Sequence, residues 1–353
     1  MTIKEISYFP FSLTLKSPFN YFSSVINERH GFILKCYDEK GNVGFGECSP
    51  LPGFSKETLN DAENEIKNII SQFTGKNVLP DFNELKSLST GTINLASVRY
   101  GFEQSLFNLI AKADSSFITR NFPDHKNYID VNAVIGIDEV ESVITKVKTK
   151  LMDGYKTIKL KIGREDPFDD FYLIVTIRDS IGFDYKLRLD ANKKWSADEA
   201  IEYLNRLFEF DIEYIEEPCE FVPSTFRTCE ETQIPAALDE SIESIDQVRD
   251  LMNSSAIQFI VLKPMIIGGF FTVVDLIKES DKANKKIIIS SAFESAIGKS
   301  GLVFLSSLTR HISAHGLDTS EFFVNNICDD PYPVRSGKIK FEAANYPPNF
   351  SLQ

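Results

Sequence analysis

The chain has 353 residues, of which 42% are hydrophobic and 25% charged, the composition of a globular protein with room for about two domains. Its formal net charge of -13 argues against a nucleic-acid partner, because binding to a phosphate backbone requires a basic surface. The five cysteines have no disulfide or zinc spacing, no apolar stretch approaches the ~20 residues of a membrane span, and no signal-peptide pattern opens the chain, so we expect a cytoplasmic protein without a membrane span.

The first part of the chain has the pattern of a small α+β unit. Two alternating runs, Ser12–Leu15 and Phe32–Tyr37, predict antiparallel strands, and the second run ends in turn-forming residues. Apolar residues at helical spacing follow at Lys56–Phe73 and Ser97–Ala113. We therefore expect an α+β domain over residues 1–125.

From about residue 130, short β-rich runs alternate with helical stretches. Two of the helical stretches begin with capping-box patterns, Ser196 with Glu199 and Ser244 with Gln247. Strand, helix and strand in repetition, at a spacing of roughly 25 residues, predict a parallel sheet of the barrel type. The expected strands are Val131–Ile135, Thr157–Lys161, Lys186–Asp190, Tyr214–Glu216, Ala236–Asp239, Phe259–Lys263, Ile287–Ser290 and, more weakly, Ile312–Ala314.

The end of the chain carries a further β signal. Tyr332–Val334 and Lys338–Phe341 are β-rich and are separated by a turn containing glycine. We therefore expect residues 126–317 to form the barrel domain, and residues 318–353 to return to the N-terminal domain.

Charged residues end five consecutive runs of this barrel pattern. In a β/α barrel the active site lies at the carboxyl ends of the strands, so these side chains are expected to gather at one rim. The two lysines on the first of these runs are two residues apart, so both point to the same face of a strand. In chain order the five runs end in Lys159 and Lys161, Asp190, Glu216, Asp239, and Lys263.

Three carboxylates and three amines suit proton transfer next to a carboxylate. Carboxylate oxygens are the ligands that Mg2+ prefers, and the metal stabilises the negative charge that forms when an α-proton leaves. A lysine beside another cation is a suitable base. One Asp after a strand is more often a helix cap or turn residue, and an isolated Lys-x-Lys is usually a solvated strand face. Five consecutive runs with the required charge favour an active site.

The segments KLKIG, LRLDANKKW, IEEP, ALDES and VLKP resemble the enolase superfamily, in its muconate-lactonizing-enzyme-like branch. This superfamily uses a Lys or His base with Mg2+. The resemblance implies a modified (β/α)7β barrel of the TIM type, with an α+β capping domain built from the N-terminal region and the C-terminal tail. It also implies Mg2+, with Mn2+ as a substitute, bound by Asp190, Glu216 and Asp239, and oriented by Asn192 and Glu217.

The loop GFGECSPLPGFS at residues 44–55 resembles the o-succinylbenzoate synthases of menaquinone biosynthesis. Residues 97–103, 290–298 and 316–319 are similar to that family as well. The polar pair Cys48–Ser49 departs from the more apolar character expected there. The resemblance implies a lyase that dehydrates the small-molecule carboxylate 2-succinyl-6-hydroxy-2,4-cyclohexadiene-1-carboxylate to 2-succinylbenzoate.

The same resemblance implies a role for each lysine. Lys161 is expected to be the general base, Lys159 its electrostatic partner, and Lys263 a cation that stabilises the enediolate through a contact with the ring. The cap loop is expected to close over the site and exclude water. The expected substrate contacts are Ser290, Ser291 and Gly316 in the barrel, and Pro52, Gly53 and Phe54 in the cap loop.

Two other functions remain compatible with these residues. An N-acylamino acid racemase or dipeptide epimerase of the same superfamily would use Lys161 and Lys263 as bases on opposite faces, so the lysines do not discriminate, whereas the cap loop favours the synthase. A non-catalytic binding protein on the same barrel is disfavoured by six chemically competent positions. The sequence does not indicate whether the chain forms homo-oligomers.

Overall fold

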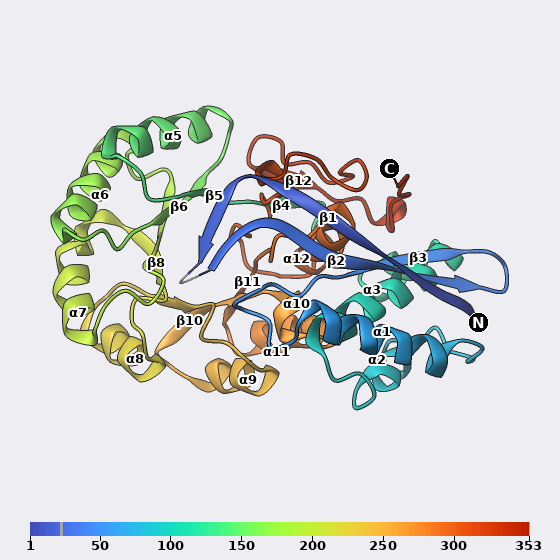
Figure 1. The fold of residues 1–353 in the computed structure, drawn as a ribbon. Coiled ribbons are helices and arrows are strands. Elements are labelled where there is room, and N and C mark those ends of the chain that lie inside the picture. Colours follow the sequence, from blue (N-terminus) through green and yellow to red (C-terminus); the bar gives the residue numbers. More distant parts are fainter. Residues whose placement is uncertain (22–23, 353) are drawn as a thin grey trace.

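The structure, a computed structural model, describes residues 1–21 and 24–352 (Figure 1). An antiparallel three-stranded sheet with its helices forms a cap on one side, and a parallel seven-stranded sheet curls into a barrel on the other (Figure 1). The architecture is therefore a modified (β/α)7β barrel covered by an α+β cap, as expected. Within the described ranges, no helix is long and apolar enough to cross a membrane.

The cap sheet has the order β1-β2-β3, with β1 at Ile3–Tyr21, β2 at Ser24–Asp38 and β3 at Val43–Cys48. The two predicted N-terminal strands lie inside β1 and β2, which pair antiparallel, and this confirms both strands. The turn into β3 forms because the Asp38 carboxylate accepts hydrogen bonds from the backbone N–H groups of Lys40 and Asn42.

Helix α3 (Ala96–Ala113) is the central element of the cap. Most of its residues are buried on all sides, because it packs between the cap sheet and the barrel helices. Gly46 of β3 permits the close approach, since a Cβ atom there would lie 1.9 Å from the carbonyl oxygen of Gly101. The other cap helices are α1 (Leu59–Phe73), which the sequence patterns predicted, and α2 (Phe82–Ser89) and α4 (Phe117–Asn121), which they did not.

The barrel sheet has the order β11-β10-β9-β8-β7-β6-β5, so each strand lies beside its neighbour in the sequence. All neighbouring pairs are parallel, as the strand–helix alternation predicted. The strands are β5 Ala133–Ile135, β6 Thr157–Lys161, β7 Lys186–Asp190, β8 Ile212–Glu216, β9 Ala236–Leu238, β10 Ile257–Leu262 and β11 Lys286–Ile289.

The eighth predicted strand was placed too early in the chain. Ile312 is 83% exposed, and the barrel is instead closed by two parallel bridges, from Val131 to His315 and from Ser290 to Gly316. The backbone N–H of His315 donates to Asp130, and that of Gly316 donates to Ile289 on the opposite side. The apolar residue that suggested a strand therefore lies on the surface, and the closing residues are polar or small.

The barrel helices curve around the outer side of the sheet (Figure 1). Ser196 and Glu199 form both bonds of the predicted capping box. Ser244 accepts from the backbone of Gln247, but the Gln247 side chain accepts from Glu243 instead of Ser244, so this second box is only half formed. The helices are α5 Val140–Met152, α6 Pro167–Ile181, α7 Ala197–Arg206, α8 Val222–Glu231, α9 Ile245–Asn253, α10 Pro264–Ile267, α11 Phe270–Lys282 and α12 Ala296–Ser307.

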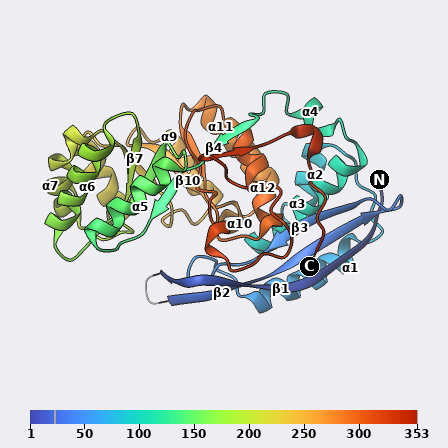
Figure 2. The same ribbon diagram turned by 90° about the horizontal axis from the view of Figure 1, so that it is seen from above.

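The C-terminal segment runs back from the barrel to the cap, with the C-terminus beside the cap strands (Figure 2). Strand β12 (Lys338–Lys340) pairs antiparallel with β4 (Tyr128–Asp130), while the predicted strand at Tyr332–Val334 is irregular. The ring of Phe350 packs edge-on against that of Phe45, with centroids 5.6 Å apart. The exact domain boundaries at 125 and 317 stay a prediction.

Candidate active site

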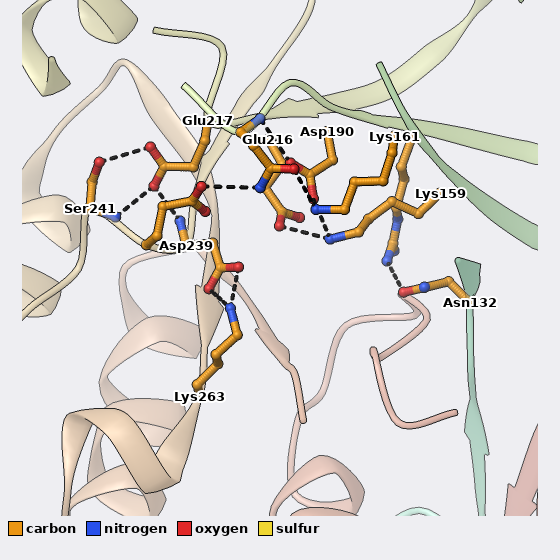
Figure 3. A network of polar contacts seen from close by, with 12 residues as sticks. Asn132, Lys159, Lys161, Asp190, Glu216, Glu217, Asp239, Ser241 and Lys263 are labelled. Carbon is orange, nitrogen blue, oxygen red and sulfur yellow. Dashed lines mark hydrogen bonds and ion pairs between the residues drawn. The ribbon is translucent and has the colours of Figure 1, made fainter. Parts of the chain in front are cut away.

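The charged residues that end the barrel strands lie together at one rim (Figure 3). Parallel register places Lys161 opposite Asp190, and Asp190 opposite Glu216, so neighbouring strands present their last side chains at the same level. A cavity of about 240 Å³ opens over them. We use the term catalytic rim for the six charged lining residues on or directly after the barrel strands, Lys159, Lys161, Asp190, Glu216, Asp239 and Lys263.

The β6 lysines lie on one side of the carboxylates. Lys159 Nζ is 2.7 Å from Glu216 Oε1 and 3.0 Å from Asp190 Oδ2. Lys161 Nζ lies 2.7 Å from the same Asp190 oxygen and 2.6 Å from Asn192 Oδ1. The two lysine side chains therefore share one aspartate and lie on the same face of β6, as their spacing of two residues predicts.

Lys263 approaches the carboxylates from the opposite side (Figure 3). It follows β10 directly and donates to both carboxylate oxygens of Asp239. Its Nζ also lies 4.9 Å from the centre of the Phe54 ring, which the cap contributes. The cavity thus has an amine on each side, with the carboxylates between them.

The mutual contacts of these groups shift their pKa values. Burial lowers the pKa of Lys159, but the charges of Asp190 and Glu216 outweigh burial and raise that pKa well above its ordinary value. Burial, only partly offset by Lys159, raises the pKa of Glu216 well above its usual range. Burial opposes ionisation of Asp190 too, but the two lysines prevail and hold its pKa low. Of these two carboxylates, Glu216 is therefore the one whose charge is less compensated.

Glu217 holds the next carboxylate in place, although it does not face the cavity. Its Oε1 accepts from the backbone N–H groups of Asp239 and Ser241, both at 2.8 Å, and its Oε2 accepts from the Ser241 hydroxyl. Burial and the nearby Glu240 raise the pKa of Glu217 to about 7. Asn192 joins the two sides, because its amide accepts from Lys161 and donates to Glu240. The orienting positions suggested for Asn192 and Glu217 are consistent with this geometry.

The rim has oxygen ligands suited to a divalent cation. Oxygens of Glu216, Asp239 and Glu240 lie within 4.8 Å of one another. Among the described residues, the Oε2 atoms of Glu216 and Glu240 are buried and accept no hydrogen bond. Buried carboxylate oxygens without donors are costly unless a cation compensates them, and oxygen ligands suit a hard cation such as Mg2+. The residues present therefore fit the implied metal.

Glu240 is the acidic residue that the sequence patterns missed. Alternation along a strand would turn it away from Asp239, but β9 ends at Leu238, and residues 239 and 240 lie in the turn that follows. The adjacent acidic pair after an apolar run was the available signal. Asp190, which the resemblance named as a ligand, lies outside this oxygen cluster, with one oxygen held by both β6 lysines.

The suggested substrate contacts are only partly brought together. Ser290, Ser291, Gly316 and Phe54 line the cavity. Gly53 lines a second, larger cavity of about 770 Å³ between cap and barrel, and Pro52 is exposed and lines neither. The cavity is also lined by Leu51, Phe293, Asp318 and Thr319, which lie in the segments that carry the resemblance but were not named as substrate contacts, and by Asn132 and Tyr214.

Comparison with known proteins identifies relatives for both parts of the chain. Residues 142–345 match the family model described as "Enolase C-terminal domain-like", and residues 3–108 match that described as "MenC, N-terminal domain". Over 319 residues, 88% of this chain and 87% of the relative, the sequence is 29% identical to o-succinylbenzoate synthase of Vibrio cholerae. It is also 24% identical to L-Ala-D/L-Glu epimerase of Clostridium acetobutylicum over 90% of each protein.

A plant relative is much longer than this chain. Protein PHYLLO, chloroplastic, of Arabidopsis thaliana is 29% identical over 305 residues, which are 79% of this chain but 18% of that protein. The match therefore concerns one segment of PHYLLO, and the activities of the whole relative cannot be transferred from it.

Solved structures share the fold over nearly the whole chain. The substrate-liganded L-Ala-D/L-Glu epimerase of Bacillus subtilis superposes with a TM-score of 0.86 at 19% identity over 97% of each chain. A dipeptide epimerase of Enterococcus faecalis, complexed with Mg and the dipeptide L-Leu-L-Tyr, gives a TM-score of 0.84 at 20% identity over 97% of this chain and 98% of that one. At these identities the likeness concerns the fold alone.

Proposed function

The chain belongs to the enolase superfamily, and we propose that it is a Mg2+-dependent o-succinylbenzoate synthase of menaquinone biosynthesis. The observation that carries the proposal is the cap. Its residues 3–108 match the MenC N-terminal domain, and it supplies Leu51 and Phe54 to the wall of the catalytic cavity. In addition, the Vibrio cholerae synthase aligns with this chain over both cap and barrel.

The lysines of this chain would move the proton. Neutral Lys161 takes the proton from ring carbon C1, and the electron pair of the broken bond moves toward the ring carboxylate to give an enediolate. When the C6–O bond breaks on the same face, the Lys161 ammonium returns the proton to the departing hydroxide, and water leaves. The ring becomes aromatic, and Lys161 is neutral again.

The remaining rim residues would hold charge in place. Lys159, bonded to Asp190 and Glu216, adds positive charge beside the base, and Lys263 faces the ring from the opposite side. Glu216, Asp239 and Glu240, with Asp190 beside them, would hold Mg2+, which supplies positive charge next to the substrate carboxylate. A Mg complex of the Enterococcus faecalis epimerase, which has the same fold, supports this choice of cation. Mn2+ has no comparable support.

A dipeptide epimerase or N-acylamino acid racemase is the second candidate, because relatives of that kind share the fold. A dipeptide substrate carries an ammonium group, which needs a free carboxylate in the cavity wall. The carboxylates there outside the catalytic rim, Asp318 and Glu321, are already paired. Asp318 accepts from the Tyr155 hydroxyl and lies 3.6 Å from Lys150, and Glu321 lies 2.7 Å from the same lysine. Both carboxylates already have cationic or hydroxyl partners, which leaves them poorly placed to pair with a substrate amine.

The test is a direct dehydration assay. The full chain with MgCl2 is mixed with the cyclohexadiene carboxylate, and the absorbance of 2-succinylbenzoate is followed, with EDTA as the metal-free control. We expect rapid, EDTA-sensitive appearance of the aromatic product. In a parallel assay, N-acyl amino acids and dipeptides are incubated in deuterated water. Racemisation with α-proton exchange, and no dehydration, would replace the proposal by the second candidate, and inactivity in both assays would favour a binding protein.

A further inference from the structure

A second group of buried charges lies where the cap meets the barrel. We call it the seam, formed by Arg29, Glu47, Ser49 and Pro50 of the cap, and by Phe293, Ser295 and Gly298 of the barrel. Glu47 is 0% exposed and Arg29 is 1% exposed. Charged side chains are almost never fully buried without a specific partner, so the contacts of these two residues require an explanation.

Glu47 of β3 binds the beginning of barrel helix α12. Its Oε2 accepts from the backbone N–H groups of Ser295 and Gly298, both at 3.0 Å, and from the Ser295 hydroxyl. Its Oε1 accepts from the Ser49 hydroxyl at 2.6 Å. A carboxylate at a helix N-terminus satisfies otherwise unpaired N–H groups and is favoured by the helix dipole. The cap thus supplies a second capping group to a barrel helix, beside the Ser295 hydroxyl, which accepts from the N–H of Ile297.

The carboxylate occupies a space that the barrel sequence leaves for it. A Cβ atom on Gly298 would lie 2.7 Å from Glu47 Oε2 and 2.6 Å from the Cβ of Glu294, so a larger residue there would collide with both side chains. Ser49 belongs to the polar Cys48–Ser49 pair that departs from the apolar character expected of the cap loop. Its hydroxyl is buried against Glu47, which gives that departure a structural reason.

Arg29 of β2 joins the two loops that meet over the cavity. Its Nη1 and Nη2 donate to the carbonyl oxygens of Pro50 and Ser49, at 2.9 and 2.7 Å, and its Nε donates to the carbonyl oxygen of Phe293 at 3.4 Å. The two cap carbonyls directly precede Leu51, which lines the catalytic cavity. One guanidinium therefore fixes a cap segment and a barrel segment at the same point.

Phe293 is held in an unfavourable backbone conformation. Its φ of 63° lies in the left-handed region, which a bulky residue rarely adopts. Its N–H donates to the Ser291 hydroxyl at 3.0 Å, and its carbonyl accepts from Arg29. Ser291 in turn bonds to Thr319 at 2.7 Å, and all three of these residues, Ser291, Phe293 and Thr319, line the cavity. Such strain persists only where surrounding contacts enforce it.

We propose that Glu47 and Arg29 are positioning residues, which hold the Ser291–Phe293 turn and the cap segment before Leu51 at the spacing that the substrate requires. Neither residue is among those that line the catalytic cavity, so they act through the groups they hold. The seam thereby sets the part of the cavity wall that Leu51, Ser291 and Phe293 form, and with it the affinity for the substrate. This inference rests on the proposed function, because it assigns the wall of the same site.

Glu103 provides a matched control. It is also a cap carboxylate with 0% exposure, and it also bonds to the beginning of a barrel helix, since its Oε2 accepts from the N–H of Phe271 in α11. Its other oxygen accepts from Ser89 of the cap. Neither partner lines the catalytic cavity. Glu103→Gln therefore perturbs the docking of cap on barrel without touching the substrate wall.

The experiment compares Glu47→Gln with Glu103→Gln in the full-length protein with Mg2+. In Glu47→Gln, the side-chain NH2 group cannot accept hydrogen bonds from the donors of Ser49, Ser295 and Gly298. The turn before α12 should therefore lose part of its support. We expect the KM for the cyclohexadiene substrate and the Kd for 2-succinylbenzoate to rise by about tenfold or more, with kcat within about threefold, because misplaced binding groups weaken substrate binding first. Glu103→Gln should leave KM and Kd within about twofold. Arg29→Lys, which keeps one donor, should fall between wild type and Arg29→Ala.

Backbone hydrogen exchange separates this inference from the proposed function. Without ligand, amides of residues 291–298 should exchange faster in Glu47→Gln than in wild type or Glu103→Gln. Absence of wild-type dehydration would overturn the proposed function, while faster exchange in Glu47→Gln alone would still support the positioning role. The inference would be overturned if Glu47→Gln changed neither the amide exchange nor the Kd for 2-succinylbenzoate. It would also be overturned if Glu103→Gln, compared at an equal thermal midpoint, changed exchange and Kd as much as Glu47→Gln does.

Discussion

The catalytic rim and the seam both contain buried carboxylates, but the hydrogen-bond partners of these carboxylates differ between the two regions. At the rim, Asp190 and Asp239 are paired with lysine ammonium groups, which are compact charges on flexible stems. At the seam, Glu47 is paired with two backbone N–H groups and one hydroxyl at the start of α12, and with the hydroxyl of Ser49 in the cap. Flexible ammonium groups can rearrange when a substrate or cation enters, whereas backbone donors are fixed. The rim is therefore suited to catalysis, and the seam is suited to holding the cavity wall in a fixed position.

Lys161→Ala should give the largest effect, because it removes the proposed base from the rim. General acid–base catalysis contributes about 10²- to 10⁴-fold, so kcat should fall by about a thousandfold, with the binding of Mg2+ and 2-succinylbenzoate largely retained. The assay follows single-turnover dehydration, with the exposed Lys194→Ala as a control. Near-normal kcat in Lys161→Ala would show that this lysine is not the base.

Glu216→Gln should separate cation binding from folding. Glu216 has a buried oxygen without a donor, so its neutral isostere should fold at least as well as wild type in EDTA. Wild type should gain about 2.7 kcal/mol of stability when free Mg2+ is a hundred times its Kd. The variant should lose most of that gain in thermal melts. Glu202→Gln, at an exposed helix site, is the control, and an equal Mg2+ response in Glu216→Gln would remove this residue from the cation site.

The pH dependence of stability should identify the buried carboxyls outside the rim. Burial raises the pKa of Glu103 from its ordinary 4.5 to about 7, against the opposing hydrogen bonds of Ser89 and Phe271. A raised pKa means that the folded state binds the proton more tightly. Its stabilising contribution is therefore complete below pH 4.5 and is lost as pH rises through about 7.

Thermal melts between pH 5 and 8 check this expectation with Glu103→Gln. Wild type should lose up to about 3 kcal/mol relative to the variant across that range, since one pKa unit corresponds to about 1.4 kcal/mol. The difference between the two midpoints should grow with pH. A constant difference would mean that Glu103 does not titrate there, and that the docking of cap on barrel keeps its charge at neutral pH.

The smallest effect is expected at the outer edge between cap and barrel. Lys56 and Glu243 form an ion pair with an N–O distance of 3.3 Å, and their side chains are 71% and 63% exposed. Exposed pairs contribute less than about 1 kcal/mol and are screened by salt. Lys56→Ala should change KM less than twofold at physiological salt, in contrast to Glu47→Gln at the buried seam. A larger rise in KM that added salt does not suppress would show that this ion pair, and not the seam, positions the cap loop.

Regular patterns carried most of the fold prediction. All seven strands of the parallel sheet, β5 to β11, were placed within one residue at their carboxyl ends, because a strand–helix repeat permits few alternatives to a parallel sheet. The errors lie where the pattern was weak. Helix α2 is short, and the closing residues His315 and Gly316 form isolated bridges without a β-rich run. The last strand was predicted around Ile312, because this residue is apolar, but its side chain is exposed.

The sequence by itself determined which charges meet at the rim. Residues that end consecutive strands of a parallel barrel converge whatever the details of packing, so Lys161, Asp190 and Glu216 could be brought together from their order alone. Only the tertiary structure decided the partners that no strand order specifies. Glu240 faces the rim because a turn begins after Leu238, and Glu47 meets Ser295 across 248 residues of chain. Such contacts depend on how two separate units dock, and local spacing carries no information about that docking.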